Sequence, residues 1–182
     1  MARKSGLTPL WKKSDIRKLL DKLGERAEFV IMDLLQRTGE EFVKIARLEG
    51  NYIDHTGNLR SSIGYVIVKD GRIIQESSFE KVKGAGENMR LVNFKTKDGQ
   101  TVKFATKGAS GDGSEGQKEG QQLARDLARI YSKGYVLIGV AGMKYAVIVE
   151  AMENKDVLTR AADKADDFIK RHSRLLFNRL SI

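Results

Sequence analysis

The chain of 182 residues contains no cysteine, which excludes disulfides, thiolate nucleophiles and cysteine metal sites together. Histidine is nearly as rare, with His55 and His172 as its only copies. No apolar run approaches the roughly 20 residues that a membrane-spanning helix needs, so no membrane segment is expected. The basic N-terminus, residues 1–5, is not followed by an apolar segment of the kind that directs secretion. These absences favour synthesis in the cytoplasm.

The composition that remains is ordinary for a globular protein, with 41% hydrophobic and 31% charged residues. The length is sufficient for one domain with a core of its own. The formal net charge is +9, and the two ends carry most of it. Residues 1–26 hold eight Lys and Arg against three Asp and Glu, and residues 155–182 hold seven against four. Such ends can contact nucleic acid, an acidic protein surface or only water.

Two long amphipathic helices are expected, one near each end of the chain. Apolar residues recur every three or four positions over residues 16–35, and the pattern resumes at Phe42 after Gly39. A glycine inside a helix costs on the order of 1 kcal/mol, too little to break a packed helix. We therefore expect one helix from an N-cap at Ser14 to about Leu48. A closing helix is expected from about Asp156.

Short β-strands are predicted between these helices. The expected strands are residues 65–69, 72–77, 91–94, 101–105 and 135–140. Asp70-Gly71 joins the first pair and is a strong signal for a β-hairpin. Residues 144–150 fit a strand or a short helix equally well. The sequence therefore predicts a single α+β domain over residues 1–182, in which long N-terminal and C-terminal helices pack on a small, mainly antiparallel sheet.

One internal stretch does not fit this pattern. Residues 107–122 are rich in glycine and contain Ala109 as their only apolar side chain. That composition predicts a flexible loop that only a partner would order, inside an insertion at about residues 83–122. The helix after it is expected to start near Leu123 and to end before Gly134.

Catalytic and metal-binding chemistry finds little support in the sequence. Ser61 or Ser62 could be combined with His55 and Asp54, but no nucleophile elbow is present and the serines fit better as turn residues. Residues 111–116 match G-x-G-x-x-G in letters, yet no Gly-Lys-Ser/Thr follows and two acids occupy the phosphate position. We expect no catalytic residues, no metal site and no cofactor.

The most distinctive stretch is Thr56-Gly57-Asn58-Leu59-Arg60-Ser61-Ser62-Ile63. Thr56 and Gly57 are typical of a helix cap and a permissive turn, and a single helical turn over 58–62 leads into a strand. The segment resembles the T-G-x-L-x-x-S-I signature of bacteriophage tail-completion, or head–tail joining, proteins. Downstream, Gly139-Val140, Tyr145-Ala146 and Val149-Glu150 are similar to the G-x…Y-A-x-x-V-E segment of that family.

The resemblance covers most of the chain, since the long helix, the first motif, the sheet, the second motif and the closing helix occur in the family's order. The residues that carry it have structural roles in such proteins: Thr56, Gly57, Leu59, Ser62, Ile63, Tyr145, Ala146, Val149 and Glu150. Besides the insertion at about residues 83–122, two departures are visible. His55 separates Asp54 from Thr56, where the family commonly has Asp-Thr-Gly, and residues 151–154 replace the usual glycine after Glu150.

The resemblance implies a structural protein of the virion and not an enzyme. Members of this family assemble as rings, often hexameric, between the head connector and the tail tube, and DNA passes through the ring. The implied partners are further copies of the chain, the connector and tube proteins and, without sequence specificity, DNA. The chain would be made in the cytoplasm of a bacterial host. The alternative from charge alone is a basic module that binds nucleic acid non-specifically.

Overall fold

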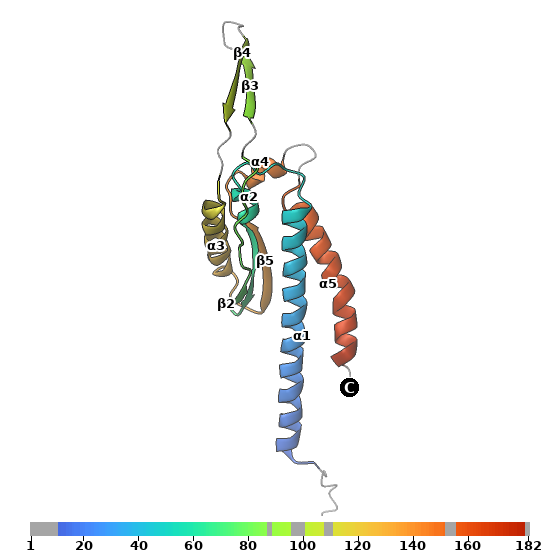
Figure 1. Cartoon of the computed structure of the whole chain (residues 1–182). Helices are drawn as coiled ribbons and strands as arrows, with labels where there is room; N and C mark the ends of the chain where they lie inside the picture. The colour runs from blue at the N-terminus through green and yellow to red at the C-terminus, as the bar shows by residue number, and fades with distance from the viewer. Residues whose placement is uncertain (1–10, 87–88, 96–100, 108–110, 152–155, 181–182) are drawn as a thin grey trace, which may run out of the picture.

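The computed structural model of the chain describes residues 11–86, 89–95, 101–107, 111–151 and 156–180. Helices and strands alternate irregularly along the chain (Figure 1). The elements are α1 (Lys13–Leu48), α2 (Asn58–Ser61), β1 (Ile63–Lys69), β2 (Arg72–Glu76), β3 (Met89–Lys95), β4 (Thr101–Lys107), α3 (Ser114–Ala128), β5 (Tyr135–Ala141), α4 (Ala146–Glu150) and α5 (Thr159–Leu180). The expected α+β class is confirmed.

The N-terminal helix α1 is one continuous element, as the sequence predicts, and it passes through Gly39 without a break. The glycine has a packing role, because a Cβ there would lie 2.6 Å from the ring of Tyr65 on β1. That ring is fully buried, and its hydroxyl donates a 2.7 Å hydrogen bond to Glu40 Oε1. The start of the helix differs slightly from expectation, since it begins at Lys13 and Ser14 is not its N-cap.

Strand β1 is the centre of an antiparallel sheet with the order β2-β1-β5. The turn to β2 contains Asp70 and Gly71, both with positive φ (49° and 80°), as tight two-residue hairpins require. On its other side, β1 pairs with β5 from Ile63↔Ala141 to Lys69↔Tyr135. The first hairpin and the strand expected at 135–140 are therefore confirmed.

Helices cover both faces of this sheet, and for that reason six consecutive residues of β1 are buried. Successive side chains of a strand point to opposite faces. Ile63 belongs to a core cluster with Phe42 of α1 and Ala161 of α5. Val66 belongs to a second cluster with Ala124 of α3. Figure 1 shows the resulting layers, with α3 on one side of the sheet and α1 and α5 on the other.

The second predicted hairpin also forms, as strands β3 and β4. The strands pair in register from Met89↔Lys107 to Lys95↔Thr101, in a sheet separate from the first. In Figure 1 this hairpin stands beyond one end of the molecule, while the start of α1 extends beyond the opposite end. The molecule is therefore elongated, with a projection at each end.

The structure corrects the expectation of a flexible loop at residues 107–122 for its second half, while residues 108–110 lie outside the described residues. Residues 114–122 are not a loop but the N-terminal part of α3, which begins at Ser114. The sequence pattern missed this helix because its buried stripe is made of small residues, Gly116, Gly120, Ala124 and Ala128, and not of large apolar ones. The helix also ends earlier than expected, at Ala128, and Gly134 lies in the connection to β5.

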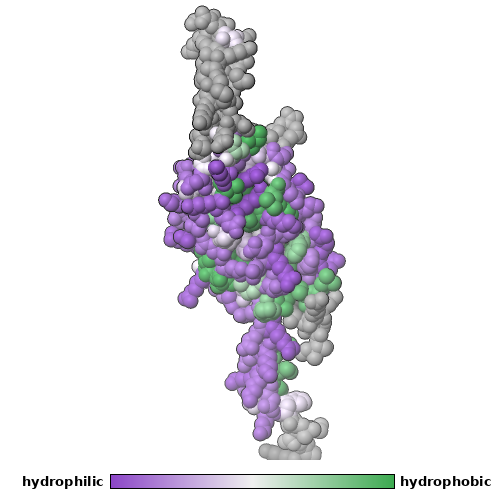
Figure 2. All heavy atoms as spheres, in the orientation of Figure 1, coloured by the Kyte–Doolittle hydropathy of each residue, from purple (hydrophilic) through white to green (hydrophobic). Residues whose placement is uncertain are grey.

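The start of α1 extends beyond both the sheet and α5 (Figure 1). We call residues 13–26 the free segment of α1. Most of its large apolar side chains remain exposed, namely Ile16, Leu19 and Leu20, while Leu23 is half-buried. Figure 2 shows this segment as a mainly hydrophilic stalk with apolar atoms on one side. Within the described residues, no helix combines the length and the apolar content that crossing a membrane requires.

Candidate functional site

The segment that carries the first motif, residues 54–63, connects α1 to the sheet, and we call it the joint. Gly57 has φ +76° and stands at the N-cap position of α2, which confirms it as the permissive turn residue. Thr56 Oγ1 accepts a 3.3 Å hydrogen bond from Asn58 N. The Asp54 carboxylate accepts a 2.7 Å bond from Arg60 N, deeper in the helical turn. The prediction of Thr56 as the N-cap is therefore wrong: Gly57 takes that position, and Thr56 and Asp54 instead accept hydrogen bonds from backbone N–H groups inside the helical turn.

The two serines of the joint are structural. Ser61 is fully buried, and its hydroxyl donates to Gly57 O at 2.7 Å and accepts from Val82 N at 2.8 Å. Ser62 is also fully buried and donates to Leu59 O at 2.8 Å. In the described part of the chain, neither hydroxyl bonds to His55. The hydroxyls stabilise the turn from inside, as the sequence suggested.

The glycine-rich segment packs directly on the joint. A Cβ at Gly116 would overlap Asn58 O, and a Cβ at Gly113 would overlap Ser61 Oγ. Asn58 also fixes the start of α3 with its side chain, accepting from Gly116 N at 3.3 Å and donating to Glu115 Oε2 at 2.7 Å. The G-x-G-x-x-G letters therefore mark a close approach of two backbones. They do not form a phosphate loop.

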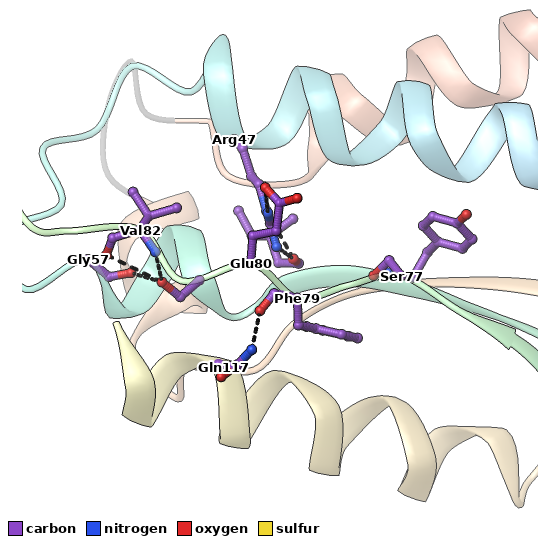
Figure 3. Close-up of polar contacts among 10 residues, drawn as sticks. Arg47, Gly57, Ser77, Phe79, Glu80, Val82 and Gln117 are labelled. Atoms are coloured by element: carbon purple, nitrogen blue, oxygen red, sulfur yellow. Dashed lines mark hydrogen bonds and ion pairs between the residues drawn. The ribbon is translucent and has the colours of Figure 1, made fainter. Parts of the chain in front are cut away.

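Residues 77–85, which we call the strap, hold the joint from a third direction (Figure 3). Gln117 of α3 donates a 2.7 Å bond to Phe79 O. On the other side, Arg47 of α1 lies 3.9 Å from Glu80, and its Nη2 donates a 2.6 Å bond to Ile63 O. The Phe79 ring is fully buried although its φ is +42°.

The strap contacts were not predicted, because single polar residues such as Arg47 and Gln117 carry no periodic signal. Burial lowers the pKa of the Arg47 guanidinium, while Glu80, Tyr52 and Glu40 favour its charged form. A nearly buried arginine therefore stabilises the point where the joint enters β1.

The structure brings the two motifs of the resemblance together. Leu59 and Ile63 from the first motif lie in the same core cluster as Ala146 from the second, and Val149 packs against that cluster. Residues 144–150, whose secondary structure the sequence left open, contain the short helix α4. The two motifs thus pack on each other in one core cluster, which also contains residues of α1 and α5.

Glu150, the last residue of the second motif, caps the closing helix. Its carboxylate accepts backbone hydrogen bonds from Val157, Leu158 and Thr159 at 2.7, 2.8 and 3.0 Å. Partial burial works against ionisation of Glu150, but bonds from Thr159, Leu158 and Val157 outweigh it and lower its pKa. The carboxylate therefore caps the start of α5, and this explains why the helix begins where it does.

Tyr145 is the motif residue that faces outward, with 37% of its surface exposed. Burial of the remainder raises the pKa of its hydroxyl, and a hydrogen bond with Thr56 opposes that rise. Tyr145 lines a groove of about 820 Å³ between the joint, α3 and α4. The other residues that line the groove are Tyr52, Ile53, Asp54, His55, Thr56, Asn58, Leu59, Glu115, Glu119, Met143, Lys144 and Val149.

The groove combines apolar walls with acidic groups. Asp54, Glu115 and Glu119 supply carboxylates, and Lys144 is the only lysine or arginine of its lining. Among the residues that the structure describes, no group of His, Asp and Glu is arranged to hold a metal ion. The geometry fits a binding surface for a segment that is both apolar and basic.

Comparison of the chain with protein-family models, with curated proteins and with solved structures finds no match.

Proposed function

We propose that this chain is the subunit of a ring at a phage head–tail junction, which joins the head connector to the tail tube and lets DNA pass. The observation that carries the proposal is the packing of the two motifs on each other. Leu59 and Ile63 lie in one core cluster with Ala146, and Glu150 caps the helix that closes that cluster. Because the two motifs pack on each other, they are parts of one structural unit. The resemblance rests on both motifs together.

The shape and surface of the subunit favour assembly. Projections extend from both ends of the molecule (Figure 1). The free segment of α1 leaves Leu19 and Leu20 more than half exposed, and α4 does the same with Val147 and Ile148. Large apolar side chains in such numbers are typical of surfaces that another chain covers.

Electron microscopy of the purified protein, combined with a mass measurement in solution, tests the proposal. We expect closed rings of one diameter and a mass that is a whole multiple of 20.4 kDa. The variant Leu20→Asp, which places a charge on the exposed stripe, is expected to shift the mass toward the monomer. A protein that remains monomeric at every concentration up to the millimolar range would contradict the proposal.

One observation favours the second candidate, a basic module that binds nucleic acid. The free segment carries exposed basic side chains that form no ion pair within the described residues: Lys13, Arg17, Lys18, Lys22 and Arg26. A DNA-binding role predicts an affinity that falls linearly with salt on a double logarithmic plot. The double change Lys18→Gln, Lys22→Gln should then reduce the slope by about two. A flat salt dependence would exclude this candidate.

A further inference from the structure

We propose that the groove binds the N-terminal arm, residues 1–12, of a second copy of this chain. The inference rests on the ring assembly proposed above, because it names a contact through which subunits of a ring would be joined. It follows from the chemistry of the groove, the sequence of the arm, and the distance between them in one subunit.

The groove presents an apolar floor with a negative rim. Leu59, Met143 and Val149 form part of its lining, and Tyr145 stands at its edge with 37% of its surface exposed. Glu115 and Glu119 on α3 are exposed beside them. A ligand that fills this site therefore needs apolar side chains close to positive charges.

The arm has this composition. Its sequence, MARKSGLTPLWK, contains three basic residues and no acidic one, and it ends in Leu10-Trp11-Lys12. Trp11 is the only tryptophan of the chain, and 63% of its surface is exposed. Large aromatic side chains beside basic residues are frequent anchors in protein interfaces.

The arm cannot reach the groove of its own subunit. The groove begins at Tyr52, four residues after α1 ends at Leu48, whereas the arm leaves the opposite end of that helix. A helix of 36 residues is about 54 Å long. Twelve fully extended residues span at most about 43 Å. An arm that occupies the groove therefore comes from another copy of the chain.

An arm-to-groove contact joins unlike surfaces of two identical subunits. Such a heterologous contact repeats from one subunit to the next and closes into a ring when the rotation allows. Each subunit then donates one arm and receives one.

Disulfide trapping tests this contact directly, because the natural chain has no cysteine. Two full-length variants, Leu10→Cys and Lys144→Cys, are mixed and oxidised. We expect disulfide-linked heterodimers between arm and groove. The matched control pairs Leu10→Cys with Asp163→Cys, an exposed position on α5 outside the groove lining, and should yield few heterodimers. Equal yields from the two pairs would overturn the inference.

Tryptophan fluorescence gives an independent measurement, since all emission comes from Trp11. We expect the emission to shift to the blue as the protein concentration rises and the arm enters a groove. Glu119→Lys should raise the midpoint concentration about fivefold, because an attractive charge becomes repulsive. The control Asp163→Lys, with the same change of charge, should leave it unchanged. A midpoint that moves equally in both variants would contradict the inference.

The two proposals fail in different ways. Rings in which Trp11 stays exposed and no arm-to-groove disulfide forms would refute the arm contact and leave the ring proposal standing. Arm-to-groove disulfides in particles that never close would support the contact and refute the ring.

Discussion

The joint and the free segment of α1 lie at opposite extremes of packing within one chain. At the joint, Ser61 and Ser62 are fully buried and glycines let backbones approach each other without side chains between them. In the free segment, Leu20 keeps 60% of its surface exposed although it stands on a regular apolar stripe. The comparison teaches that small residues allow the close packing of the joint, whereas the large apolar residues of the free segment stay exposed in the single chain.

The largest expected effect comes from filling the space at the joint. In Gly57→Ala, a Cβ would overlap Val82 O and the residue would keep a positive φ of 76°. We expect a loss of about 3–5 kcal/mol in the free energy of unfolding, measured by urea denaturation.

Two other glycines separate the causes. Gly134→Ala has a positive φ of 74° but no neighbour within 4 Å, so it should cost only about 1 kcal/mol. Gly24 in the free segment has neither a positive φ nor a neighbour within 4 Å. Gly24→Ala should therefore stabilise the helix by about 0.5–1 kcal/mol. If all three variants lost the same stability, the joint would not differ from the free segment in packing.

The next effect concerns the carbonyl at which the joint enters β1. Arg47 donates to Ile63 O through Nε at 3.2 Å and Nη2 at 2.6 Å. Arg47→Met leaves that buried carbonyl without these donors and should cost about 2–3 kcal/mol of stability, measured by thermal or urea denaturation. The same change at exposed Arg17 in the free segment should stay within about 0.5 kcal/mol. Equal losses of stability in Arg47→Met and Arg17→Met would contradict the expected difference between the joint and the free segment.

A smaller effect, dependent on pH, is expected at the cap of α5. The pKa of Glu150 in the folded chain lies below its ordinary value of 4.5, so its ionised form stabilises the fold above that pH. Glu150→Gln should cost about 1 kcal/mol at pH 7, reduced where solvent screens the partly exposed carboxylate. The difference between the two proteins should shrink as the pH falls through the folded pKa.

Denaturation from pH 7 down to pH 3 checks this expectation. The control Glu25→Gln, at an exposed carboxylate of the free segment, should change the free energy of unfolding by no more than about 0.5 kcal/mol. A Glu150→Gln difference that grows on acidification would have the wrong sign and would contradict the capping role.

The smallest effect on stability should accompany a clear effect on assembly. Leu20→Ser changes an exposed side chain and should alter the free energy of unfolding by no more than about 0.5 kcal/mol. The same substitution at Leu34, whose surface is 8% exposed, should cost several times as much. Sedimentation should nevertheless show weaker self-association for Leu20→Ser. If that variant destabilised the monomer as much as Leu34→Ser, the stripe would belong to the core of the chain.

Sequence reasoning predicted the elements that carry a strong local pattern. The stripe of α1 continues across Gly39, and Asp70-Gly71 defines a hairpin by its backbone preference alone, so both could be predicted without tertiary information. It failed at α3, where Gly116 and Gly120 pack because they lack side chains. Hydrophobic periodicity cannot detect a face of that kind.

The candidate site shows the same limit. The motif residues were identified individually, but their meeting in one core cluster depends on how β5 pairs with β1, which no local pattern encodes. Arg47 and the strap residue Glu80 are far apart in sequence, and only the folded chain brings them within 3.9 Å. The groove, formed by the joint, α3 and α4 together, likewise exists only in the fold.

The roots of the β3–β4 hairpin have a mechanical consequence. Gly84 N donates to Gly111 O at 3.1 Å, so the two legs are tied to each other where they leave the body. One leg is held by the joint through Ala85 N and Asp54 O, and Val82 N is bound by Ser61. The other leg continues directly into α3 through Gly113. A force applied to strands β3 and β4 is therefore taken up at two attachment points, one on the joint and one at the start of α3.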